Sequence, residues 1–159
     1  MSEKTALLET IQQSRQAIQS VIEGVDPKTV IHLDSGWTIK DLLAHLTMWE
    51  IHYTKALEAF NAGDEPYVIP NYSYEQIDDY NQRQYKVYKP EVMDDVLEKW
   101  AAAREAFIAA VTLFDEKRAD ERMPAPANPT QTPRVLTLIK FALGHEKWHQ
   151  DEIVAVVGG

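Results

Sequence analysis

The spacing of the apolar residues, which recur at alternating steps of three and four, most constrains the fold of this chain. An α-helix turns once in about 3.6 residues, so residues at this spacing line one face of a helix. The clearest stripe consists of Leu42, Leu46, Trp49, Tyr53, Ala56 and Phe60. Three further segments repeat the pattern, and no segment alternates convincingly as a β-strand does. The sequence therefore predicts an all-α protein built as a four-helix bundle.

Stripes and helix-end signals together predict four long helices and one short extra helix. Their approximate ranges are residues 3–23, 38–61, 73–88, 91–114 and 132–157. The residues expected as N-caps are Ser2, Thr38, Ser73 and Thr132. Thr38 and Ser73 are each followed three positions later by an acidic or amide residue, which is the spacing of a capping box. Pro90 and Pro133 suit the first turn of the helices that follow them.

Length and composition indicate one domain, covering residues 1–159. The net charge of −9 disfavours a nucleic-acid partner, because an acidic surface repels the phosphate backbone. No apolar run approaches the roughly 20 residues that a membrane-spanning helix needs, and no signal peptide is visible. The chain has no cysteine, which excludes disulfides, cysteine nucleophiles and thiolate ligands from it and fits a cytoplasmic protein.

The most informative stretch for function is residues 144–153, which holds His145 and His149. Side chains four residues apart on a helix share one face, with Cβ atoms about 5–6 Å apart. The same face carries Leu138, Ala142, Glu152 and Val156, three of them core-type residues. A third histidine, His45, borders the apolar stripe of the second helix. Three neutral imidazoles that converge between helices can hold a divalent transition metal and leave a coordination position open, as catalytic sites do.

The same residues also have simpler interpretations. Two histidines four residues apart occur by chance in many helices, and a single histidine such as His45 is more often a hydrogen-bonded bundle residue. His32 and His52 are expected at the surface or at a pocket rim. Glu152 and Asp41 are candidates to accept the second ring N–H of the ligand imidazoles. Candidates for a general base are His52 and Tyr53, and no catalytic residue is assigned.

Two segments resemble the DinB-like superfamily. The sequence GWTIKDLLAHL at residues 36–46 is similar to the start of that superfamily's second helix, and GHEKWHQDEI at residues 144–153 is similar to its metal-binding last helix. By position, the resemblance implies that His45, His145 and His149 hold the metal, commonly zinc or nickel. It also implies an up-up-down-down bundle with a long crossover connection, often as a homodimer.

The resemblance implies several activities. Some DinB-like proteins resemble thiol S-transferases and isomerases that use bacillithiol, mycothiol or glutathione, and others resemble a toxin-protecting hydrolase branch, ClbS/DfsB-like. The first hypothesis is therefore a metal-dependent enzyme that adds a low-molecular-weight thiol to a small electrophile, with metal-assisted hydrolysis as the second reaction class. A non-enzymatic protein that sequesters a small molecule or toxin is the alternative. The third hypothesis is a dimerising structural module that buries Leu42, Leu46 and Trp49 between subunits.

Overall fold

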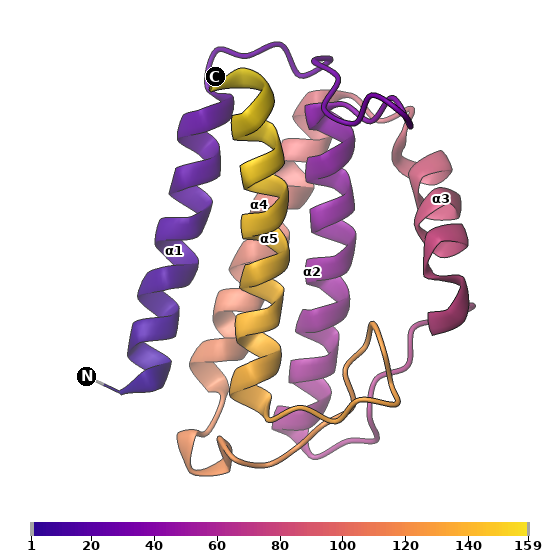
Figure 1. The fold of residues 1–159 in the computed structure, drawn as a ribbon. Coiled ribbons are helices and arrows are strands. Elements are labelled where there is room, and N and C mark those ends of the chain that lie inside the picture. Colours follow the sequence, from indigo (N-terminus) through magenta and orange to yellow (C-terminus); the bar gives the residue numbers. More distant parts are fainter. Residues whose placement is uncertain (1, 159) are drawn as a thin grey trace.

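The computed structural model describes residues 2–158, and these residues fold into a bundle of α-helices (Figure 1). The α-helices are α1 (Glu3–Ile22), α2 (Ile39–Ala62), α3 (Ile77–Tyr88), α4 (Met93–Leu113) and α5 (Val135–Val157), with single 3₁₀ turns η1 (Tyr74–Gln76) and η2 (Glu116–Arg118). Over this range there are isolated β-bridges but no β-strand. The predicted all-α four-helix bundle with one short extra helix is confirmed.

The directions of the four long helices differ from the expected order. Lys140 Nζ near the start of α5 lies 4.0 Å from Oε1 of Glu3 at the start of α1, so α1 and α5 are parallel, which the expected order does not allow. Lys4 Nζ donates to the carbonyl of Phe114 at 2.8 Å, so α1 and α4 are antiparallel. Figure 1 shows α1 and α5 running one way and α2 and α4 running the other. The order is up-down-down-up, and the expected up-up-down-down order is wrong. The helical periods predict which faces are apolar, but they carry no information on the direction of each helix.

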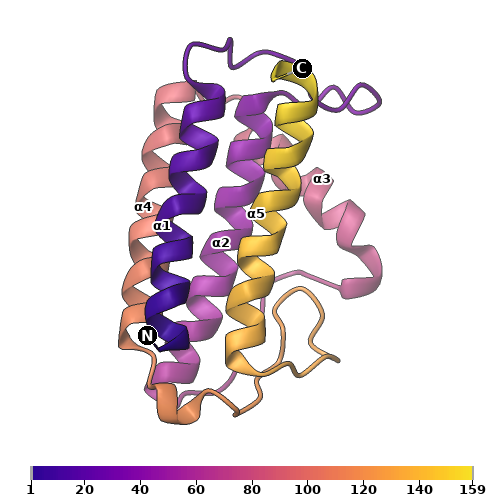
Figure 2. The same ribbon diagram turned by 60° about the vertical axis from the view of Figure 1, so that its left-hand side comes forward.

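A long crossover connection is present, as expected, and it contains α3. It joins α2 to α4, which lie side by side and parallel, so the chain must travel the length of the bundle between them (Figure 2). The side-chain amide of Asn61 donates to the carbonyl of Ala110 at 2.9 Å, which ties the ends of the two helices together. α3 stands apart from the four long helices (Figure 1).

Two of the expected helix starts are confirmed by their capping contacts. Ser2 accepts from the amide of Thr5, and Thr38 forms a complete capping box with Asp41. The other expected starts are wrong. Ser73 bonds to Glu75 instead of capping η1, and no side chain caps α4 or α5, which begin at Met93 and Val135, two to three residues later than predicted. Pro90 and Pro133 therefore precede their helices.

The apolar stripe of α2 packs inside the chain. Leu42, Leu46 and Trp49 are at most 4% exposed against α4, α5 and the other helices, so intrachain packing accounts for this face and removes the reason to assign it to a subunit interface. The stripe of α5 ends earlier than expected, since Val156 is about half exposed. Among residues 2–158, no helix is long and apolar enough to cross a membrane.

The connection between α4 and α5 is ordered against the bundle. The amide of Met123 donates to the carbonyl of Pro133, and the amide of Val135 donates to the carbonyl of Glu121, so its two arms run side by side. The side chain of Met123 is buried in the core. This connection lies beside the end of α2 and the start of α5 (Figure 1).

Candidate metal centre and adjoining chambers

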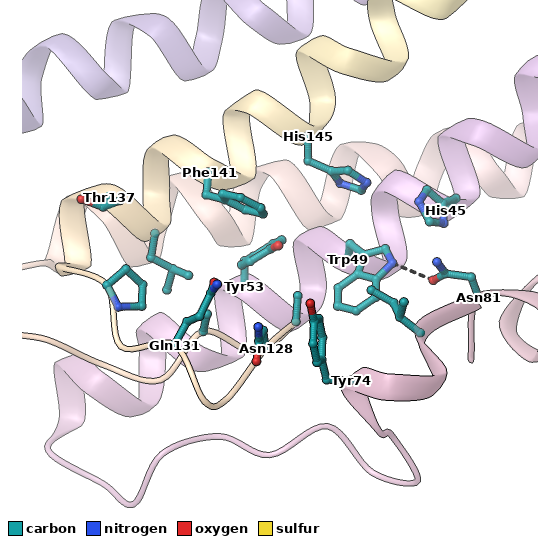
Figure 3. A pocket seen from close by; sticks show the side chains of 15 residues that line it. His45, Trp49, Tyr53, Tyr74, Asn81, Asn128, Gln131, Thr137, Phe141 and His145 are labelled. Carbon is teal, nitrogen blue, oxygen red and sulfur yellow. Dashed lines mark hydrogen bonds between the residues drawn. The ribbon is translucent and has the colours of Figure 1, made fainter. Parts of the chain in front are cut away.

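The structure brings together the three histidines that the sequence singles out. His145 and His149 project from α5 and His45 projects from the antiparallel α2; the ring centroids are 4.8 to 5.2 Å apart. One nitrogen of each ring lies within 4.8 Å of one nitrogen of the other two. His45 and His145 face the same space between α2 and α5 (Figure 3). The predicted convergence of three imidazoles is therefore present.

Burial makes these three imidazoles neutral at physiological pH. Loss of hydration lowers the pKa of His45 well below its ordinary value, and the neighbouring histidines lower it further. The same cause lowers the pKa of His145 to about 3. Burial also lowers the pKa of His149, partly opposed by Glu152. A neutral imidazole keeps a lone pair on one ring nitrogen, which is the form that binds a metal ion.

The donor set fits a borderline transition metal ion. Nδ1 of His45 is buried and has no hydrogen-bond partner among the described residues, which is unusual for a polar atom in a protein interior. Three imidazoles without any thiolate suit zinc or nickel, and three protein ligands leave a position for a further molecule. His45, His145 and His149 thus remain the predicted ligands.

A second group of side chains surrounds the outer edge of the cluster. Nδ1 of His149 lies 3.4 Å from Oε1 of Glu152, and the other carboxylate oxygen of Glu152 contacts Nε2 of His32. Glu152 therefore lies within ion-pair distance of His149, but Nδ1 of His149 makes no hydrogen bond with the described residues, so the expected hydrogen-bonded partner is not formed. His32 lies at the rim, as expected, and stacks on Trp37, which in turn packs against His45.

Asp41 does not accept a hydrogen bond from the ring of His45, contrary to expectation. One of its oxygens accepts from the amide and hydroxyl of Thr38, so its carboxylate caps α2. His52 is not at the surface, but it lines a separate pocket of about 230 Å³ beside α2 and α3, in keeping with the expected position at a pocket. It is 8% exposed and bonds through its two nitrogens to the hydroxyls of Tyr67 and Tyr80.

Neither candidate for a general base is supported by its surroundings. Burial raises the pKa of Tyr53, so its hydroxyl stays protonated at neutral pH. His52 bonds to two tyrosines and is not among the residues that line the cavities at the histidine cluster.

Two cavities meet at the histidines. The first, about 510 Å³, lies among α2, α3, α5 and the connection before α5, and Figure 3 shows its side chains; we call it the neutral chamber. The second, about 520 Å³, opens beside His149 and is lined by Asp34, Asp78 and Glu152 and by no lysine or arginine; we call it the acidic chamber. His45 and His145 line both, so a metal ion there is reachable from two chemically different sides.

A buried network of four charged residues lies directly behind the histidine cluster, and sequence reasoning missed it. Each long helix contributes one member: Arg15, Glu50, Arg104 and Glu146, all at most 7% exposed. Arg15 and Arg104 each contact both glutamates. Glu50 and Glu146 lie beside His145 and Tyr53. The available signal was that all four fall on inward faces, where charged residues are rare unless they are paired.

The helical bundle and the histidine-lined pocket between α2 and α5 together define the class of protein with which this chain can be compared. The family model of the DinB superfamily matches residues 10–153. The chain therefore belongs to the DinB superfamily, and the resemblance inferred from its two motifs is confirmed.

Solved structures with the same fold are distant in sequence. An uncharacterised protein from Escherichia coli UTI89 is 15% identical, with a TM-score of 0.78 over 98% of this chain and 92% of that chain. The colibactin self-resistance protein ClbS, solved in complex with a double-stranded DNA, is 13% identical, with a TM-score of 0.72 over 98% of this chain and 96% of that chain. At these identities the likeness shows the shared fold alone. A comparison with curated proteins found no match.

Proposed function

We propose that this chain is a metal-dependent enzyme in which His45, His145 and His149 hold a zinc or nickel ion. The proposed reaction adds a low-molecular-weight thiol to a small electrophile in the neutral chamber, with hydrolysis as the second reaction class. The observation that carries this proposal is the convergence of three neutral imidazoles where two cavities meet. No acid or base of the chain is assigned to the chemical step.

The ion would supply electrostatic activation, because a bound divalent metal lowers the pKa of a coordinated water or thiol. The residues of the chain position the reactants. Glu152, which contacts His32, lies beside the ring of His149, and Trp37 packs against His45. Trp49 and Tyr53 exclude water from the side where the electrophile binds. The site is therefore shaped on one side for an apolar molecule and open on the other side for a nucleophile.

The charge of the acidic chamber bears on the nucleophile. Asp34, Asp78 and Glu152 line it without a neighbouring lysine or arginine, so an anionic thiol that enters there meets repulsion. Water or a thiol without net negative charge meets none. This favours a neutral or cationic thiol over glutathione, which carries a net negative charge at pH 7.

Metal content is the direct test of the proposal. Protein purified without an affinity tag is expected to contain about one zinc or nickel ion per chain by mass spectrometry. The variants His145→Ala and His149→Ala are expected to lose it, because two imidazoles hold such an ion weakly. His52→Gln is the matched control, since it removes a buried histidine outside the cluster. Metal-free wild-type protein with intact helical content would contradict the proposal.

The nucleophile is tested with two thiols of opposite charge. The rate of aromatic substitution on 1-chloro-2,4-dinitrobenzene, in which the thiol sulfur replaces chloride, is measured for cysteamine and for glutathione. After subtraction of the uncatalysed rates, the enzyme is expected to favour cysteamine, and Asp78→Asn is expected to narrow the difference. Catalysis with neither thiol, but release of product from an ester substrate, would favour hydrolysis.

Sequestration of a small molecule is the second candidate function. The neutral chamber is large enough to enclose a ligand and is mostly apolar. ClbS, with the same fold, is described as a self-resistance protein. Ligand binding that survives chelation and the removal of His145, with the ligand recovered unchanged, would favour sequestration over catalysis.

A further inference from the structure

The side chains that line the neutral chamber share one property that sets them apart from the rest of this acidic protein. Fifteen residues line it, and none is an aspartate, glutamate, lysine or arginine. Its two histidines, His45 and His145, lie at one end of the chamber (Figure 3). More than a quarter of the chain is Asp, Glu, Lys or Arg, so their absence from this cavity indicates selection of its contents by charge.

Away from any metal ion held by His45 and His145, a charged ligand would lose its hydration in this chamber without gaining a counterion from a side chain. Moving an ionised group from water into such surroundings costs far more than moving a neutral polar group that finds a hydrogen bond. The acidic chamber on the other side of His45 would add repulsion for an anion. An uncharged molecule avoids both costs.

Aromatic rings shape the middle of the chamber. Trp49, Tyr53, Tyr74 and Phe141 lie between the histidines at one end and Gln131 at the other (Figure 3). Trp49 is held by a hydrogen bond of 3.0 Å from its Nε1 to the Oδ1 of Asn81. Flat rings provide large contact areas for another flat ring, through stacked or edge-to-face packing.

The end of the chamber distant from His45 carries amide groups. Oδ1 of Asn128 accepts from the hydroxyl and amide of Thr130, which fixes the orientation of the side chain and leaves its Nδ2 as a donor. Gln131 lines the same end (Figure 3). Backbone hydrogen bonds from Ala125 to Gln131 and from Gln131 to Asn128 hold this turn in place.

We propose that the neutral chamber binds an uncharged, flat aromatic molecule that carries a hydrogen-bond acceptor, such as a carbonyl oxygen, at the Asn128 end. Its ring system lies among Trp49, Tyr53 and Phe141, and its reacting atom points toward His45 and His145. This inference rests on the proposed function only in naming the electrophile, because binding in the chamber does not require the metal ion.

Two nearly isosteric probes test the charge preference. Isothermal titration calorimetry compares 2-naphthamide with 2-naphthoate, on the protein as purified and after EDTA treatment. After EDTA treatment the neutral amide is expected to bind at least about ten-fold more tightly, because the carboxylate must then be desolvated without a counterion. The saturated analogue decahydro-2-naphthamide is expected to bind more weakly than the aromatic amide. Equal affinity for amide and carboxylate would overturn the proposal.

Introducing a positive charge tests the location. Thr137 lines the chamber but is exposed on α5, so Thr137→Lys is compatible with folding. It is expected to raise the affinity for 2-naphthoate relative to 2-naphthamide by about ten-fold, since the ammonium supplies the missing counterion. Leu33→Lys, at a position 92% exposed and outside the chamber, is the matched control and should leave the ratio unchanged.

The outcomes separate this inference from the proposed function. If no metal is found but the amide preference and its response to Thr137→Lys persist, the chamber assignment stands and the enzyme proposal fails. If metal is present but Thr137→Lys and Leu33→Lys have the same effect, the chamber assignment fails and the metal site stands. Loss of amide binding in Phe141→Ala, with helical content retained, supports the ring position, and unchanged binding contradicts it.

Discussion

The two groups of buried ionisable residues at the centre of this protein differ in how many oppositely charged groups they face. The three clustered histidines have lost hydration, only His149 lies near a carboxylate, Glu152, and burial lowers the pKa of each so that they are neutral. Arg15 and Arg104 are equally buried but each faces two carboxylates. The network of paired arginines and glutamates thus lies next to the cluster of neutral imidazoles. The arginines of the network are stabilised by their glutamate partners.

Removing one carboxylate from the buried network is expected to destabilise the fold strongly. Glu50 accepts from Arg15 at 3.0 Å and from Arg104 at 2.6 Å. Glu50→Gln leaves two guanidinium groups with one carboxylate, which is expected to lower the free energy of unfolding by about 3–5 kcal/mol. The matched control is Glu105→Gln at an exposed position of α4, where a change within about 0.5 kcal/mol is expected. Urea denaturation measures the free energy of unfolding of both variants. Equal changes would show that the ion pairs of Glu50 do not stabilise the fold.

His52 is expected to make folding sensitive to acid. Burial, assisted by Lys55, lowers its pKa from 6.5 to about 4 in the folded protein. The unfolded chain therefore binds a proton first, so the contribution of His52 is full above the unfolded pKa and declines as pH falls through the window from 6.5 to 4. Solvent screening reduces the contribution below the roughly 3 kcal/mol that a shift of this size would give in full.

The measurement compares the pH dependence of unfolding in two proteins. His45 and His145 are also buried with lowered pKa values, so the wild type alone cannot isolate His52. In His52→Gln the free energy of unfolding is expected to fall less steeply between pH 7 and pH 4.5 than in the wild type. Parallel pH profiles would contradict the assignment.

At the scale of elements, helix starts differ in how they are secured. Thr38 and Asp41 exchange hydrogen bonds at the start of α2, which positions the helix that carries His45. α5 begins without a side-chain cap, and backbone contacts of the preceding connection hold its start instead. Gly63 ends α2 with φ of 72°, a left-handed conformation that glycine adopts without strain.

The capping box of α2 is expected to contribute measurably to stability. Thr38→Ala removes the oxygen that accepts from the Asp41 amide and is expected to lower the free energy of unfolding by about 1 kcal/mol. Thr38→Ser keeps the hydroxyl and is the control, with a change of a few tenths of a kcal/mol expected. Thermal denaturation by circular dichroism measures both; identical losses would assign the effect to the methyl group of Thr38.

At the scale of the whole molecule, the surface charge is at odds with one structural relative. ClbS was solved with a double-stranded DNA, whereas this chain carries a net charge of −9. The absence of a nucleic-acid partner stays a prediction. The expected homodimer also stays a prediction, and sedimentation equilibrium across protein concentrations measures it.

We expect no specific affinity of this chain for duplex DNA. Fluorescence anisotropy with a labelled duplex at 150 mM salt is expected to show binding weaker than about 100 μM, because 25 acidic residues outnumber 16 lysines and arginines and repel the phosphate backbone. Lowering the salt concentration is expected to change the result little. Micromolar binding that weakens steeply with added salt would contradict the prediction.

The sequence by itself determined the helical segments, the bundle class and which three histidines converge. Helical period and the spacing of His145 and His149 are local properties, readable without a fold. The tertiary structure alone decided the up-down-down-up order, the pairing of Glu50 and Glu146 with two arginines, and the enclosure of His52 by two tyrosines. These depend on which helix faces which, and in a bundle of similar amphipathic helices that choice is made by side-chain contacts between residues distant in the chain.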